Sequence, residues 1–174
     1  MTTRRPLNGA IAGAVAAAVW AAQQPLDKRV FGCDYDDVEM LGKAVTRGSA
    51  WPVAGLALHL QNGATFGAAY ASVRPLLPGP PMAWAVTAAM LENFGSWPLV
   101  RLVDNLHPAR SDLPSLAGNR RALAQATWRH FLFGAVMGVV EARLNDRSAE
   151  EPPPTVPVES NGHGSLEQAV AAAG

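Results

Sequence analysis

The sequence predicts an all-α protein, a four-helix transmembrane bundle with one short amphipathic surface helix and a disordered C-terminal tail. Three observations predict this fold. Four mainly apolar stretches, at about residues 7–23, 51–73, 82–103 and 122–142, are separated by polar or proline-rich segments. Each approaches the roughly 20 helical residues that match a bilayer core about 30 Å thick. Tryptophans lie near the ends of these stretches, and a Gly-x-x-x-Gly spacing recurs within them.

The first stretch is rich in alanine and follows a pair of arginines. A basic start before an apolar segment also fits a signal peptide. The bulky Trp20 near the would-be cleavage site and the Gly9/Gly13 pair favour a retained helix instead.

The polar segment that follows contains the predicted surface helix, at about residues 35–46. Asp34 is a candidate N-cap, and Val38, Leu41 and Val45 then recur at helical spacing. A helix this short is expected at the membrane surface or against the end of the bundle.

The remaining stretches are bounded by prolines and charges. A proline-rich turn follows the second stretch, and Pro98 is expected to kink the third because a proline inside a helix removes one hydrogen bond. The fourth stretch ends near residue 142, and the chain then becomes polar and proline-rich. We therefore expect a membrane domain at residues 1–145 and a disordered tail at residues 146–174.

Small residues and tryptophans have expected roles in this bundle. Glycines one turn apart let helix backbones approach closely, and the sequence has three such pairs, Gly9, Gly13, Gly63, Gly67, Gly134 and Gly138. Tryptophan rings prefer the headgroup level of a bilayer, and the expected interface anchors are Trp20, Trp51, Trp84, Trp97 and Trp128. The alternative, a water-soluble four-helix bundle, needs polar faces that the first stretch lacks.

A few polar side chains interrupt the apolar stretches and form the candidate site. They are His59, Asn62, Glu92, Asn93, His130 and Glu141. Charged groups at membrane depth are rare and usually paired or functional. Three interpretations are open: a hydrogen-bonded network that fixes helix pairing, a proton or solute pathway, and a metal site built from His59, Glu92 and His130. The Glu-x-x-His pairs of di-iron bundles are absent, so no metal is assigned.

Charge and motif content exclude several classes of protein. The 14 basic and 14 acidic residues give a formal net charge of zero, so no nucleic-acid partner is expected. Cys33 is the only cysteine, which rules out a disulfide within the chain. Nucleophile-elbow, zinc-protease and phosphate-loop motifs are absent, so we expect neither an enzyme nor a cofactor.

The layout resembles the YagU-like family of small inner-membrane proteins. The resemblance covers roughly residues 7–147 and is carried by a histidine before a Gly/Ala-rich run to tyrosine, and by a later histidine, glutamate and arginine. These are His59, Tyr70, His130, Glu141 and Arg143. The resemblance implies a four-helix integral membrane protein of uncharacterised function and no catalytic role.

The sequence therefore predicts a small multi-pass membrane protein that acts as a non-enzymatic packing or accessory subunit. The alternative is a proton or small-solute transporter subunit that uses His59, Glu92 and His130. The expected location is the bacterial plasma membrane. The expected partners are the lipid bilayer and a second copy of the chain or another membrane protein.

Overall fold

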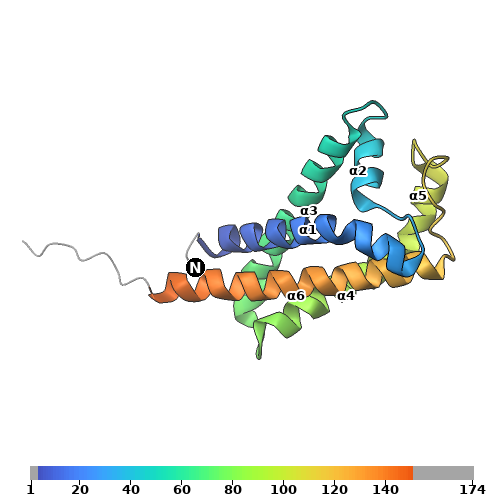
Figure 1. Ribbon diagram of the computed structural model, residues 1–174. Helices are drawn as coiled ribbons and strands as arrows, with labels where there is room; N and C mark the ends of the chain where they lie inside the picture. Colours follow the sequence, from blue (N-terminus) through green and yellow to red (C-terminus); the bar gives the residue numbers. More distant parts are fainter. Residues whose placement is uncertain (1–3, 151–174) are drawn as a thin grey trace, which may run out of the picture.

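The described part of the chain, residues 4–150 of the computed structural model, is all-α (Figure 1). No strand occurs in this part, which confirms the predicted class. The helices are α1 (Arg4–Phe31), α2 (Asp37–Val45), α3 (Trp51–Val73), α4 (Pro81–Ser96), α5 (Val100–Leu106) and α6 (Arg120–Glu150). Short 3-10 turns at Arg74–Leu76 and Trp97–Leu99 follow α3 and α4.

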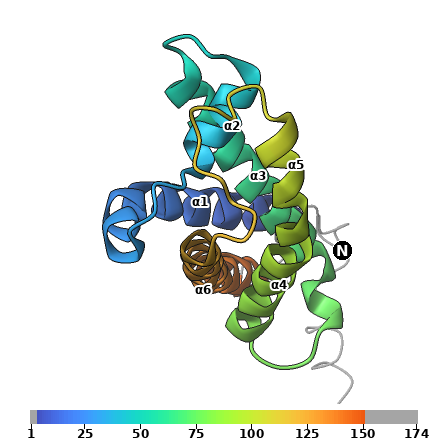
Figure 2. The same ribbon diagram turned by 90° about the vertical axis from the view of Figure 1, so that its right-hand side faces the viewer.

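The two longest helices form the base of the molecule. Helices α1 and α6 lie side by side and run in opposite directions (Figure 1). Helix α3 packs on α1, α4 packs on α6, and α2 packs on α3. Seen along the base, α3 and α4 lie on the same side of the α1–α6 pair (Figure 2). Since α3 and α4 each pack mainly on a different base helix, side chains between them are free to line a pocket.

Glycines allow the closest helix contacts. A Cβ added at Gly13 would lie 1.9 Å from the carbonyl oxygen of Gly63, and one at Gly9 would lie 2.3 Å from that of Gly67. Backbone cannot yield at such distances, so α1 and α3 touch only because these residues are glycine. Gly134 and Gly138 of α6 face the backbone of α4 in the same way.

The core between these helices is built mainly from small and aromatic side chains. Trp20, Tyr70, Phe133 and Met137 are buried there with alanines of α1 and α4. A second buried cluster, around Tyr35 and Leu116, joins the segment between α1 and α2 to the start of α6.

Several helix bounds differ from the expected ones. Helix α1 continues through Pro25 to Phe31, and Asp27 beyond the proline is buried and holds this end of the helix to Arg129 of α6. Pro98 divides the third apolar stretch into α4, a 3-10 turn and α5. Helix α2 is capped by Asp36, whose side chain accepts a hydrogen bond from the Glu39 amide. Helix α6 runs to Glu150, and the rest of the predicted tail lies outside the described residues.

The membrane assignment is wrong. Across residues 4–150, no helix combines the length and the apolar character needed to cross a bilayer. Alanine, glycine and polar residues dilute the hydropathy of the long helices, and α4 has only 16 residues, about 24 Å. This finding overturns the four predicted spans, the multi-pass membrane subunit, the transporter alternative and the plasma-membrane location. The headgroup role of the tryptophans depended on those spans and is lost with them.

Large apolar side chains are nevertheless exposed on the outer faces of several helices. Examples are Leu7 and Ile11 on α1, Val53 on α3 and Leu91 on α4. The partners expected from the sequence, and the expected absence of nucleic acid, stay predictions.

Candidate functional site

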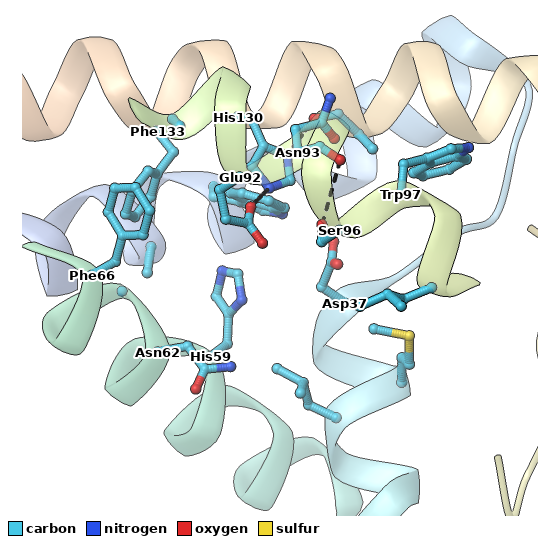
Figure 3. Close-up of a pocket in the computed structure, with 18 of the residues that line it drawn as sticks. Asp37, His59, Asn62, Phe66, Glu92, Asn93, Ser96, Trp97, His130 and Phe133 are labelled. Atoms are coloured by element: carbon cyan, nitrogen blue, oxygen red, sulfur yellow. Dashed lines mark hydrogen bonds and ion pairs between the residues drawn. The ribbon is translucent and has the colours of Figure 1, made fainter. Parts of the chain in front are cut away.

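A pocket of about 870 Å³ opens between α3 and α4 (Figure 3). Its walls come from α3 and α4, and its floor from α1 and α6 together with aromatic residues of α3. Residues of α2 and α5 line one end. The other ends of α3 and α4 are held together, because the Tyr70 hydroxyl donates to the Pro81 carbonyl at 2.6 Å.

The floor of the pocket is aromatic. The indole of Trp20 makes edge-on contacts with the rings of His59 and His130, at centroid distances of 5.2 and 4.7 Å. Phe133 contacts both Trp20 and Phe66 in the same manner. Such contacts fix ring orientations, so the floor is a rigid surface contributed by α1, α3 and α6.

Glu92 and His130 form an ion pair at the wall of the pocket. The His130 Nε2 lies 2.7 Å from a carboxylate oxygen of Glu92, and its Nδ1 lies 2.7 Å from the Ala126 carbonyl oxygen. The hydrogen bond from His130 is the largest cause that lowers the pKa of Glu92, although burial opposes it. Both contacts are made to acceptor oxygens, so they fix the orientation of the His130 ring between the Ala126 carbonyl and Glu92.

His59 reaches into the pocket from α3 toward Glu92 (Figure 3). It is only 7% exposed, and its Nε2 has no hydrogen-bond partner. Burial lowers the pKa of His59 below its ordinary value, so the imidazole is neutral near pH 7. His59 is therefore a buried, neutral polar group beside a cavity, with one ring nitrogen unsatisfied.

Five of the six polar residues picked out from the sequence line this pocket: His59, Asn62, Glu92, Asn93 and His130. The Asn93 amide donates to the Thr127 hydroxyl at 3.2 Å, which joins α4 to α6. Glu141 lies elsewhere, near Arg5 at 3.5 Å, and burial is the main cause that raises its pKa. Trp20 and Trp97 also line the pocket, whereas the other three tryptophans do not.

A buried ionic cluster adjoins the pocket and was missed by sequence reasoning. Arg129 of α6 binds Asp27 of α1 through two N···O contacts of 2.6 Å, and Asp37 of α2 through one of 2.9 Å. The Arg129 side chain also donates to the Tyr35 carbonyl, and Gln125 donates to Asp27 at 2.7 Å. Desolvation opposes the charge of Arg129, but hydrogen bonding to Asp27 and attraction to Asp37 outweigh it and raise the pKa of the guanidinium.

A signal for this cluster exists in the helical spacing. Asp27 continues the stripe of Gly13, Trp20 and Gln24, which recurs at helical intervals and is buried in the structure. A charge on a buried stripe needs a buried partner. The neighbouring Lys28 and Arg29 hide this signal, because three charged residues in a row are typical of an exposed segment.

The polar groups of the pocket differ in how far their hydrogen bonds are satisfied. Both nitrogens of His130 are engaged, with the Ala126 carbonyl and with Glu92, whereas the Nε2 of His59 has no partner. Over the part of the chain that the structure describes, no group of three histidine, cysteine or carboxylate side chains is placed to hold a metal ion.

Comparison with known proteins leaves this geometry as the basis for a functional proposal. No protein-family model, curated protein or solved structure matches the chain. The resemblance to the YagU-like family stays a prediction.

Proposed function

We propose that this chain binds a small organic molecule in the pocket between α3 and α4. The observation that carries the proposal is the unsatisfied Nε2 of His59, which is buried at the edge of a cavity of about 870 Å³. Leaving a buried polar group without a partner costs about 1–3 kcal/mol. This nitrogen is covered by its neighbours, so a small turn of the His59 ring on binding lets a ligand reach it and removes the cost.

The size and lining of the pocket support the same proposal. Binding pockets for small molecules are typically about 300–1,000 Å³, mostly apolar, with a few convergent polar groups. Here the aromatic rings of Trp20, Phe66 and Phe133 offer an apolar surface, and His59 and Glu92 offer the polar groups. The matching ligand has an apolar body and one polar end.

The test uses 3-phenylpropan-1-ol as an uncharged probe and titration calorimetry on the full-length chain. Asn62 is exposed at the pocket wall, so Asn62→Trp fills the mouth of the pocket without touching the buried core. Val53→Trp adds the same ring to an exposed site on the same helix, away from the pocket. We expect Asn62→Trp to weaken binding at least about tenfold and Val53→Trp to leave it unchanged.

Two results contradict the proposal. One is the absence of measurable binding to the unmodified chain. The other is equal binding to both tryptophan variants, because the probe then occupies the exposed apolar faces of the helices instead of the pocket.

A further inference from the structure

The charges around the pocket are unbalanced. Asp37 and Glu92 are the carboxylates that line it, and no lysine or arginine is among its described lining residues. Asp37 shares the Arg129 guanidinium with Asp27, so that cluster holds two carboxylates against one cation. The counter-group of Glu92 is the imidazole of His130, which offsets the carboxylate only when it is protonated. The groups together keep at least one net negative charge beside the cavity.

The carboxylate of Glu92 is also accessible from the cavity. Its side chain is 44% exposed, whereas that of its partner His130 is 16% exposed. An incoming ligand therefore meets the negative member of the ion pair first. His59 is neutral, and the unpaired indole Nε1 of Trp20 is an uncharged donor, so neither changes the sign of the site.

We infer that the ligand of this pocket is an organic cation, a molecule with an ammonium or similar group on an apolar body. This inference rests on the proposed function and specifies its ligand. The cationic group is placed at Glu92, within reach of the unsatisfied His59 nitrogen, and the apolar body lies on the floor made by Trp20, Phe66 and Phe133. Aromatic rings add to the attraction, because their faces are negative and bind cations.

Acidic side chains alone do not establish such a site. The independent observation is His59, which is more than nine-tenths buried, aimed into the cavity and unpartnered at Nε2. A neutral imidazole nitrogen of this kind accepts a hydrogen bond from an ammonium in the tautomer that leaves Nε2 unprotonated. The negative charge of the carboxylates favours a positively charged ligand. The imidazole of His59 accepts a hydrogen bond from that ligand.

The test compares three probes that share one apolar body: 3-phenylpropylammonium, 3-phenylpropan-1-ol and 3-phenylpropanoate. Dissociation constants are measured on the full-length chain at pH 7 and low ionic strength. We expect the ammonium to bind at least about tenfold more tightly than the alcohol, and the carboxylate to bind most weakly. The advantage of the ammonium should shrink as salt is added.

A charge variant assigns the effect to the pocket. Glu92→Gln should remove most of the preference for the ammonium over the alcohol. Glu39→Gln removes the same charge from α2 outside the pocket lining, and should keep the preference. The ratio of two affinities is unaffected by a modest loss of stability in either variant, and the comparison of probes on the unmodified chain needs no variant at all.

The outcomes separate the two proposals. If the alcohol binds in the pocket and the ammonium binds no more tightly, the cation inference is wrong while pocket binding stands. If Glu39→Gln abolishes the preference as fully as Glu92→Gln, the preference reflects overall charge and the inference is again wrong. If Asn62→Trp changes the dissociation constant of none of the three probes, both proposals are wrong.

Discussion

Asp27 of α1 and Arg129 of α6 form a bidentate ion pair whose two N···O distances are both 2.6 Å. Their side chains are 1% and 0% exposed. The same guanidinium binds Asp37 at the start of α2, so one side chain joins three helices at the end of the pocket. Planar guanidinium groups suit such shared contacts, because they donate several hydrogen bonds in fixed directions.

Removing this guanidinium should destabilise the fold strongly. Arg129→Met leaves Asp27 and Asp37 buried without a counter-charge, and breaking a buried pair in this way costs about 3–5 kcal/mol. Urea denaturation followed by circular dichroism measures the loss. Arg143→Met, an exposed position on the same helix, is the matched control and should change little. Similar midpoints for the two variants would show that the cluster contributes no stability.

The contact between α1 and α3 should not tolerate a methyl group. Gly13→Ala places a Cβ against the Gly63 carbonyl, so the helices must separate, at a cost of about 1–3 kcal/mol or more. Gly95 lies in α4 with open space around it. Gly95→Ala should therefore be neutral or stabilise the helix by up to about 1 kcal/mol. Thermal unfolding of both variants tests the difference, and equal destabilisation contradicts the close packing.

His59 should make the fold sensitive to mild acid. Burial is the main cause that lowers the pKa of His59 in the folded state, while the charge of Asp37 and a hydrogen bond with the Ala17 backbone oppose the shift. The unfolded chain therefore takes up the proton first as the pH falls below about 6.5. Stability contributed by the neutral imidazole is full above that pH and decreases as the pH falls toward the folded pKa.

The measurement is the unfolding free energy of the wild type and of His59→Gln between pH 7.5 and about 5. The difference between the two curves isolates His59 from the other titrating groups. We expect the wild type to lose its advantage over the variant as the pH falls. If the unfolding free energies of the wild type and of His59→Gln change in parallel over this pH range, His59 is not buried as a neutral imidazole.

The pKa of Glu92 should depend on His130. The hydrogen bond from His130 is the largest cause of the lowered pKa, so His130→Gln should raise the pKa of Glu92 toward or above its ordinary value. Carboxyl carbon NMR titration reports this directly. His107→Gln is the control, because His107 contacts the Met40 carbonyl instead of the pocket. An unchanged Glu92 titration in His130→Gln rules out the ion pair.

The sequence located the polar residues of the site well and misjudged their surroundings. The rise of about 1.5 Å per residue places five of them at similar levels of their helices. These five residues line one pocket: His59, Asn62, Glu92, Asn93 and His130. Glu141 stood at the end of its apolar stretch, and it lies away from the pocket. The position of a residue along its helix was thus informative, although the bilayer predicted around the helices was wrong.

The Asp27–Arg129 pair shows why the rest was not accessible from the sequence. The partners are 102 positions apart in the chain, and only the packing of α1 against α6 brings them together. Mean hydropathy is an average over consecutive residues, so it does not show which face of a helix carries a charge. The alanine- and glycine-rich composition that indicated membrane helices also serves close helix packing, as at Gly13 and Gly63.

The central claim, that the pocket between α3 and α4 holds a small molecule, is tested most directly by the indole N–H resonances of the five tryptophans. Trp20 and Trp97 line the pocket, and Trp51, Trp84 and Trp128 do not. On titration of 3-phenylpropan-1-ol into the ¹⁵N-labelled full-length chain, we predict saturable shifts of the Trp20 and Trp97 signals alone. Uniform shifts of all five signals, or shifts confined to Trp51, Trp84 and Trp128, would contradict the claim.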